Sequence, residues 1–557
     1  MTTYSNTAYY KALQARDARF DGCFFTGVTS TGIYCRPVCR VKAPKQQNCR
    51  FFAHAAQAEA AGFRPCMRCR PELAPHSLIW STQDASHTLA LQAAHLLDAG
   101  WLTANASPCS QSDANTPANP SPSIAALAAR LGISDRHLRR IFEAHLGVSP
   151  LQYLQTRRLL TAKQLLTDTR LSVQDVALTS GFASLRRFNA AFAAHYRFSP
   201  SQLRREGRSG ASASKARSQT TSPASAALTV KLAYRPPYDV PAMLDFWHTR
   251  QINAMESVAA CAHSTLVSRT FSIQIGTKTY CGWLSARFDE TNCQVLLQVG
   301  DSLVPALPTV IARMRAALDL DADPKAINAV LGAHFPGQAG LRVPGALDGF
   351  EVAVRAIVGQ QVTVAAGRTF TQRLVDQFGE PLATPWPELS KLFPRPEALA
   401  QADPNVLGAL GIVKQRQKAL IALSQAVASG QLNLNTPAQA LQTVEQLKAL
   451  PGIGDWTAQY IAMRALRWPD AFPAGDVALH NALGLRDVKN PAKAAEQASQ
   501  AWRPWRSYAV LRAWATLALP AKKPAPSSSK TPGKPIKRAG VSKTFTINSV
   551  AACAIFN

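Results

Sequence analysis

Four cysteines near the start of the chain place the strongest constraint on how it can fold. They form two closely spaced pairs, Cys35-x3-Cys39 and Cys66-x2-Cys69, separated by 26 residues. Each pair can hold one edge of a tetrahedral zinc ion, and the intervening segment then closes the site. The alternative is a set of reduced thiols that pack without a metal. We predict a small zinc-bound α/β module over residues 1–78, called the zinc module below.

Length and charge indicate several domains that bind an anionic polymer. At 557 residues the chain is too long for one core, and its 47% hydrophobic content suffices for globular folding. The formal charge of +27 favours nucleic acid as the partner, with an anionic membrane as the weaker alternative. No apolar stretch approaches 18 residues, so we expect no membrane span. We therefore expect a cytoplasmic protein whose 11 cysteines serve metal or thiolate chemistry.

Changes in composition divide the chain into segments. Residues 104–123 and 206–227 are rich in small and polar residues and lack a hydrophobic period, which is typical of linkers. Residues 521–557 are rich in Lys, Pro and Ser, which indicates a disordered basic tail. The predicted fold is multidomain and mainly α with α+β parts. After the zinc module it comprises two helix-turn-helix units within 85–205, a small α/β domain at 228–307 and an all-helical core at 308–520.

Two similar segments within 85–205 have the pattern of helix-turn-helix units. In the first segment, Gly132 interrupts an apolar helical period and Ser134 can cap the next helix. In the second, Gly181 and Ser184 follow in the same order, and the two serines stand 50 residues apart. This arrangement resembles the AraC-type DNA-binding domain, which implies promoter DNA and RNA polymerase as partners. The second helix of such a unit enters the major groove. We expect DNA contacts from its arginines, namely Arg136, Arg139, Arg186 and Arg187.

Two long runs surround the four cysteines, FDGCFFTGVTSTGIYCRPVCRVKAP and RFFAHAAQAEAAGFRPCMRCRPE. They resemble the N-terminal domain of the Ada methylation-response regulator over nearly all of residues 10–75. The resemblance implies that Cys35 accepts a methyl group from a DNA methylphosphotriester. Because methylation turns a thiolate into a neutral thioether, the site would repel DNA phosphates less. Lys42, Arg64 and Arg36 are the expected phosphate neighbours.

The C-terminal half contains the run LKALPGIGDWTAQYIAMRAL. Gly452 and Gly454 favour a hairpin between two helices, where backbone amides can approach a DNA phosphate. Asp476 follows Gly454 by 22 residues. This pairing resembles the helix-hairpin-helix glycosylases, and among them the AlkA-type 3-methyladenine DNA glycosylases. Further matching runs are YRPPYD, FEVAVRAIVGQQVTVAAG and WRPWRSYAVLRAW.

The second resemblance implies a role for each matching residue. Asp476 would stabilise the oxocarbenium character of the sugar and orient or deprotonate the attacking water. Trp456, Tyr460 and Trp514 would line a pocket that holds a flipped, positively charged base by stacking and cation–π attraction. The alternative is that Asp476 only caps a helix and that the aromatic residues only fill the core.

Three features refine the expected activity. Relatives that also cut the backbone carry a lysine where this chain has Trp456, so we expect a monofunctional enzyme that leaves an abasic site. Gln361 stands where AlkA-type enzymes can carry an apolar wedge, so we expect an altered lesion preference. The C-terminal cysteine cluster of iron–sulfur relatives is missing. Zinc is therefore the expected cofactor, and the hairpin can also bind a monovalent cation.

These patterns together predict a DNA alkylation-repair protein and regulator. We expect a monomer in the bacterial cytoplasm, at the nucleoid, that binds alkylated and promoter DNA and no membrane. The other hypothesis is a transcription factor whose glycosylase half is catalytically silent and only binds DNA. The flexible composition of 206–227 favours modules that act independently.

Overall fold

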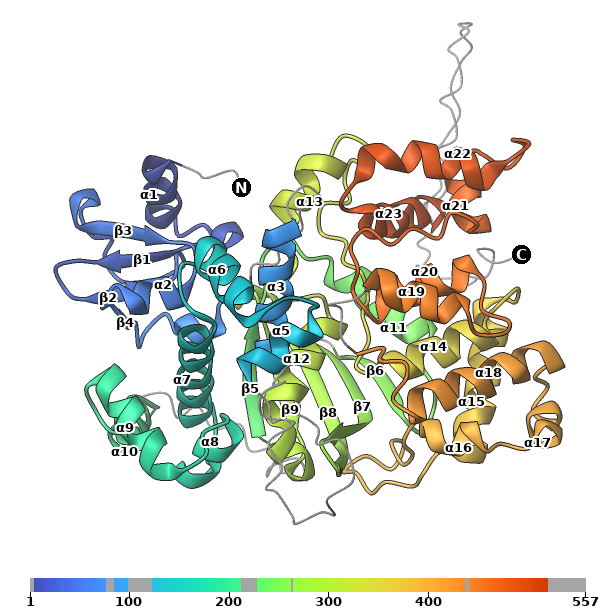
Figure 1. Ribbon diagram of the computed structural model, residues 1–557, viewed down its shortest axis with the longest axis horizontal. Helices are drawn as coiled ribbons and strands as arrows, with labels where there is room; N and C mark the ends of the chain where they lie inside the picture. Colours follow the sequence, from blue (N-terminus) through green and yellow to red (C-terminus); the bar gives the residue numbers. More distant parts are fainter. Residues whose placement is uncertain are drawn as a thin grey trace, which may run out of the picture.

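A computed structural model describes residues 5–76, 85–98, 123–211, 228–261, 264–435 and 440–518. In Figure 1 the zinc module lies to the left of a central sheet, and most helices of the C-terminal half lie to its right. Apart from Ser123, the predicted linker 104–123 is outside the described residues, as is the predicted tail 521–557. Within the described ranges, no helix combines the length and the apolar character needed to cross a membrane.

The zinc module is built on a four-stranded sheet of order β3-β1-β2-β4. Its elements are α1 (Asn6–Gln14), β1 (Phe25–Val28), β2 (Ile33–Cys35), β3 (Cys49–Phe52), α2 (Ala55–Ala60) and β4 (Arg64–Pro65). β2 and β4 pair in parallel, with Tyr34 opposite Pro65. Because Cys35 ends β2 and Cys66 follows β4, this pairing brings the two cysteine pairs to the same edge of the sheet.

Two helix-turn-helix units follow, as predicted. The helices are α3 (Ala85–Asp98), α5 (Ile124–Arg130), α6 (Asp135–Leu146), α7 (Pro150–Asp168), α8 (Val173–Thr179), α9 (Leu185–Tyr196) and α10 (Pro200–Ala211). Ser134 and Ser184 cap α6 and α9, since each side chain accepts a hydrogen bond from a backbone N–H of the first turn. Because α10 continues to Ala211, the predicted linker boundary at 206 is too early.

A five-stranded antiparallel sheet of order β5-β9-β8-β7-β6 forms the centre of the molecule. The elements are β5 (Leu228–Ala233), α11 (Val240–Thr249), β6 (Glu256–Cys261), β7 (Ser264–Ile275), β8 (Lys278–Asp289), β9 (Gln294–Val299) and α12 (Leu307–Ala317). Val310 and Met314 of α12 share a buried cluster with Val295 and Leu297 of β9. The predicted boundary at 307 is therefore wrong, because α12 belongs with the sheet; we call residues 228–317 the sheet domain.

The remaining helices share one hydrophobic core, in which almost all residues of α14 are buried and α15, α18 and α20 pack on it. They are α13 (Pro324–Leu331), α14 (Gly349–Val358), α15 (Val364–Phe378), α16 (Pro396–Ala400), α17 (Pro404–Ala409), α18 (Lys414–Ala428), α19 (Ala440–Lys448), α20 (Asp455–Arg464), α21 (Val477–Ala482), α22 (Pro491–Ala498) and α23 (Arg506–Ala518). Trp502, Trp505 and Tyr508 are buried in this core. The predicted helical core is confirmed.

Candidate functional site

The four predicted zinc ligands lie together at one end of the zinc-module sheet. The Sγ atoms of Cys35, Cys39, Cys66 and Cys69 are all within 4.8 Å of one another. Tetrahedral zinc with Zn–S bonds of about 2.3 Å separates its sulfurs by about 3.8 Å. The four-thiolate cluster therefore fits zinc, and the predicted metal site is confirmed.

Two buried cations brace the cysteine loops. The Arg36 backbone N–H donates to Cys69 Sγ at 3.3 Å, and the Arg36 guanidinium donates to the Cys69 carbonyl at 3.0 Å. Lys163 of α7 donates to the Cys66 carbonyl at 3.1 Å. Arg36 is only 7% exposed, so the expectation that it meets DNA phosphates is wrong. Its positive charge instead offsets the negative thiolates from inside the module.

The other two expected phosphate neighbours keep some contact with solvent. Lys42 is exposed, and Arg64 on β4 is partly buried. Both side chains remain able to reach an external anion, and their role stays a prediction.

In the helical core, Asp476 is buried and fully anchored. It is 3% exposed and caps α21, because its Oδ1 accepts a hydrogen bond of 2.6 Å from the Leu479 backbone N–H. Oδ1 also accepts from Trp514 Nε1 at 2.9 Å, and Oδ2 accepts from Trp456 Nε1 at 2.8 Å. The sequence left open whether Asp476 is a cap or a reactive carboxylate. Its two indole contacts exceed what a helix cap requires.

The predicted aromatic residues lie beside this carboxylate. The Trp456 and Tyr460 rings stack with centroids 5.3 Å apart and an angle of 12°. Both line a cavity of about 140 Å³ between α11, α14 and α20. Trp514 of α23 is linked to Trp456 through Asp476, because both indole N–H groups donate to its carboxylate. The structure thus brings the predicted base-pocket residues together with the predicted catalytic residue.

Two arginines that the sequence analysis missed also line this cavity. The Arg250 guanidinium lies 3.8 Å from the Phe246 ring centroid, and that of Arg464 lies 5.6 Å from the Tyr460 centroid. Burial alone would raise the pKa of the Tyr460 hydroxyl, but Arg464 and Arg250 hold that pKa below its usual value. Because these guanidinium groups lie over the Phe246 and Tyr460 rings, cations of the protein itself already occupy part of the aromatic surface of the cavity. Arg464 was accessible to sequence reasoning, since it stands four residues after Tyr460 on one helix.

The hairpin between α19 and α20 has the predicted glycine geometry. Gly452 has a φ of 78°, and Gly454 is exposed with no atom within 4 Å of an added Cβ. Gln360 Nε2 donates to the Gly452 carbonyl at 3.0 Å. This contact fixes the loop after α14 against the hairpin. The next residue in that loop, Gln361, is exposed and has a φ of 53°. No contact of the described hairpin residues assigns ligands to the expected monovalent cation, which stays a prediction.

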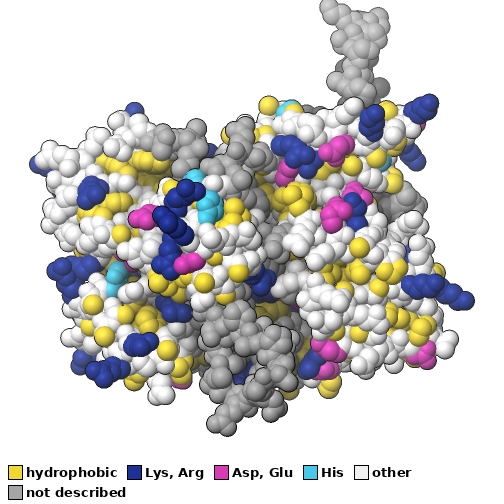
Figure 2. Space-filling model, viewed as in Figure 1, with side chains coloured by type: hydrophobic (Ala, Val, Ile, Leu, Met, Phe, Trp, Pro, Cys, Tyr) yellow, Lys and Arg dark blue, Asp and Glu magenta, His cyan; other side chains and the backbone are white. Residues whose placement is uncertain are grey.

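The four predicted DNA-reading arginines are exposed on the two expected helices. Arg136 and Arg139 lie on α6, and Arg186 and Arg187 lie on α9. Arg139 also pairs with Asp135 at 3.0 Å. Figure 2 shows Lys and Arg side chains gathered over α6 and around α9 and α10 on this face. The exposed charge suits a phosphate backbone.

Four family models match consecutive parts of the chain. They are the metal binding domain of Ada at 8–72, a helix-turn-helix domain at 127–206, the AlkA N-terminal domain at 229–348 and the HhH-GPD superfamily base excision DNA repair protein at 354–507. The probable bifunctional transcriptional activator/DNA repair enzyme AlkA of Mycobacterium tuberculosis (strain ATCC 25618 / H37Rv) is 35% identical over 517 residues, which is 92% of this chain and 96% of that protein. The chain belongs to this AlkA-type bifunctional family.

Two further relatives correspond to separate parts of this AlkA-type chain. DNA-3-methyladenine glycosylase 2 of Escherichia coli (strain K12) is 36% identical over 286 residues, covering 51% of this chain and 96% of the relative. The bifunctional transcriptional activator/DNA repair enzyme Ada of the same strain is 33% identical over 181 residues, covering 32% of this chain and 44% of the relative. The chain therefore joins an Ada-type zinc module and a helix-turn-helix domain to an AlkA-type glycosylase.

Proposed function

We propose that Asp476 is the catalytic carboxylate of a monofunctional glycosylase that excises N-alkylated purines from duplex DNA. One observation carries the proposal: a buried carboxylate is held by Trp456 and Trp514, and Trp456 also lines the cavity. Three donors that point at the carboxylate oxygens fix its position before substrate binds.

The reaction follows from this geometry. The N-glycosidic bond breaks and the alkylated base leaves with the bonding electrons, while positive charge develops on the sugar. Asp476 stabilises that charge, and water then adds to the anomeric carbon as its proton passes to a base such as this carboxylate. Trp456 occupies the position of the lyase lysine and has no amine that could form a Schiff base. The product is therefore an intact abasic site.

Base release from methylated duplex DNA tests the assignment with Asp476→Asn. Asparagine can still cap α21 but carries no charge, so we expect release to fall by at least about 100-fold. Asp403→Asn is the matched control, because Asp403 also caps a helix, α17, but is exposed. Equal release by wild type and Asp476→Asn would refute the role of Asp476. A wild type that binds DNA without releasing bases would support the silent transcription factor.

We further propose that Cys35 is the methyl acceptor. Zinc, when bound, keeps the four sulfurs as thiolates at neutral pH. The Cys35 sulfur attacks the methyl carbon of a methylphosphotriester, the carbon–oxygen bond breaks, and the phosphodiester leaves as an anion. Cys35→Ala should abolish uptake of labelled methyl groups, whereas Asp476→Asn should not change it. Cys49→Ala is the control, because Cys49 is a free cysteine outside the metal cluster; uptake without Cys35 would exclude this nucleophile.

The proposed partners follow from the exposed charge on α6 and α9. We propose that Arg136, Arg139, Arg186 and Arg187 contact promoter DNA, and that Lys42 and Arg64 contact phosphates near Cys35. We also propose that the protein acts as a monomer at the nucleoid and contacts RNA polymerase. Substituting an arginine that reads bases should relax the sequence preference of binding. Substituting a residue that contacts phosphate should weaken binding to every duplex alike and reduce the salt dependence of binding.

A further inference from the structure

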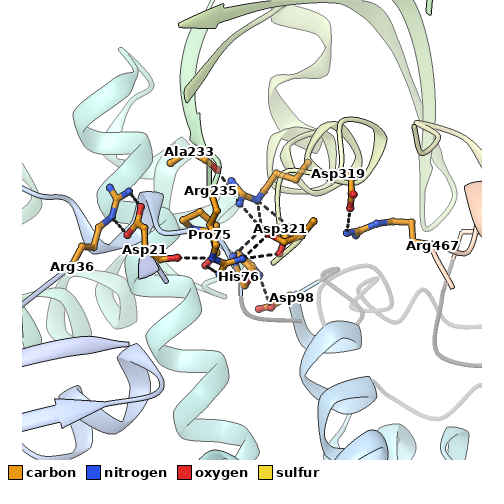
Figure 3. Close-up of polar contacts among 12 residues, drawn as sticks. Asp21, Arg36, Pro75, His76, Asp98, Ala233, Arg235, Asp319, Asp321 and Arg467 are labelled. Carbon is orange, nitrogen blue, oxygen red and sulfur yellow. Dashed lines mark hydrogen bonds and ion pairs between the residues drawn. The ribbon is translucent and has the colours of Figure 1, made fainter. Parts of the chain in front are cut away.

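Arg235, two residues after the end of β5, is buried in a contact between the sheet domain and the zinc module. It is 0% exposed, and its guanidinium donates five hydrogen bonds to main-chain carbonyl oxygens (Figure 3). Five is the full donor capacity of a guanidinium. The acceptors are three carbonyls of the zinc module, Asp21, Pro75 and His76 at 2.6, 3.0 and 2.8 Å, and two after α12, Asp321 and Ala322 at 2.8 and 3.1 Å.

His76, the last described residue of the zinc module, is held at the same place by a second set of contacts. Its backbone N–H donates to the Asp321 carboxylate at 2.8 Å, and that carboxylate also pairs with Arg315 of α12. Its ring lies 3.3 Å from the carboxylate of Asp98 at the end of α3 and 2.8 Å from Arg157 of α7. The zinc module, the helix-turn-helix helices and the sheet domain therefore meet at His76 (Figure 3).

Helix α7 forms an additional bridge between the zinc module and the sheet domain. Lys163 is 1% exposed and donates to Glu72 at 2.6 Å in the zinc module. The adjacent Gln164 donates through Nε2 to the Lys231 carbonyl of β5 at 3.0 Å. Helix α7 thus contacts both the zinc module and the sheet domain through adjacent residues. The docking therefore does not depend on Arg235 alone.

A short chain of contacts connects Arg235 to the zinc ligands. Asp21 offers its carbonyl to Arg235 and its carboxylate to Arg36, whose backbone N–H donates to Cys69 Sγ. Gly22 allows this close approach: it has a φ of 72°, and an added Cβ would lie 2.0 Å from the Pro75 carbonyl oxygen. The loop that receives Arg235 is therefore the loop that braces the metal site.

We propose that the zinc module is docked on the sheet domain and that the intact four-cysteine site stabilises the glycosylase half. Unfolding of the zinc module would remove three of the five acceptors from a guanidinium buried in the sheet domain. Water would then replace fixed acceptors that pair with a charged donor, so the sheet domain would lose the stabilisation that these hydrogen bonds supply. Such coupling is reciprocal, so the sheet domain also stabilises the metal site. The methyl acceptor and the glycosylase then approach DNA as one body, whereas the composition of the linker at 206–227 predicted independent modules.

Urea unfolding of the full-length protein, with and without a zinc chelator, tests the coupling. Eight of the ten tryptophans lie between 247 and 514 and none lies in 5–76, so tryptophan fluorescence reports mainly on the glycosylase half. We expect zinc removal to lower the urea midpoint of wild type by about 0.5 M or more, and zinc addition to restore it. In zinc-loaded Arg235→Met the midpoint should already be lower, and chelation should lower it less than in wild type, because the contacts of α7 remain. Arg287→Met is the matched control, because Arg287 is exposed on β8, and it should respond to chelation as wild type does.

Two results would overturn the proposal. One is a wild-type midpoint that chelation leaves unchanged while bound zinc is shown to be released. The other is an Arg235→Met midpoint that falls on chelation as far as that of wild type. If Arg235→Met does not fold, Arg235→Gln, which keeps two donors, replaces it. Hydrogen exchange on the zinc-loaded protein provides a second readout, and Arg235→Gln should then accelerate exchange at residues 20–24 without losing zinc.

Discussion

The indole Nε1 of Trp456 donates a hydrogen bond of 2.8 Å to Oδ2 of Asp476, and the same ring stacks on Tyr460 in the cavity wall. One side chain thus positions the carboxylate and forms part of the cavity wall. Trp514 supplies a second indole donor from α23. Trp456, at the position that we predict corresponds to the lyase lysine, thus aims the group that we propose stabilises the sugar cation.

Trp456→Phe separates these two roles. Phenylalanine keeps an aromatic ring beside Tyr460 but cannot donate to Asp476. Loss of a hydrogen bond to a charged group costs about 1.5–3 kcal/mol, so single-turnover base release should slow by about 10- to 150-fold. Affinity for duplex DNA should change much less. A single-turnover rate equal to that of wild type would show that the indole donor does not contribute to the reaction.

The two hairpin glycines should respond differently to alanine. At Gly452 the positive φ and a Cβ contact of 3.1 Å to Ala419 both oppose a side chain, so Gly452→Ala should lower the free energy of unfolding by about 1–2 kcal/mol. Gly454 has a φ of −85° and open space around an added Cβ, so Gly454→Ala should fold normally. Denaturant unfolding and binding to undamaged duplex measure both effects. Normal folding with weakened binding in Gly454→Ala would place DNA against the hairpin, and unchanged binding would contradict that placement.

Gln361→Gly tests the residue at the wedge position without a folding penalty. Its φ of 53° suits glycine, so the variant should be at least as stable as wild type. Without a side chain to fill the gap left by a flipped base, affinity for lesion-containing duplex should fall, and undamaged duplex should bind as before. Comparison of several alkylated bases would also reveal the expected change in lesion preference. Equal lesion affinity in both proteins would exclude a gap-filling role.

Acid should destabilise the zinc module through His54. Burial lowers the pKa of His54 to about 4, nearby His87 adds to this effect, and Asp98 opposes it. Because the folded pKa lies below the unfolded value of about 6.5, the neutral ring contributes stability above pH 6.5 that is lost as the pH falls toward 4. The free energy of unfolding should drop by at most about 1.4 kcal/mol per pH unit in this window. His54→Gln should show a shallower slope in urea titrations at several pH values, and an unchanged slope would assign the effect to other groups.

Some features of the site were predictable because their signals are local in the sequence. The spacing of Cys35, Cys39, Cys66 and Cys69 identifies the metal site, and the capping serines with their glycines mark the helix-turn-helix units. The exact role of Asp476 was not decided locally, because a cap and a catalytic carboxylate have the same sequence pattern. Its indole partners stand 20 and 38 residues away in the chain, on α20 and α23.

The sequence by itself determined the order of modules, the four thiolates and the identity of the hairpin and its carboxylate. Only the tertiary structure decided how the modules meet. Arg235 contacts Asp21 across 214 residues; each stands in a run that resembles a known family, but no spacing within either run predicts that the two residues meet. Burial of Arg36, the placement of α12 on the sheet and the position of Arg250 in the cavity wall were undecided for the same reason. A long-range contact depends on which surfaces exclude water together, and local spacing does not record that choice.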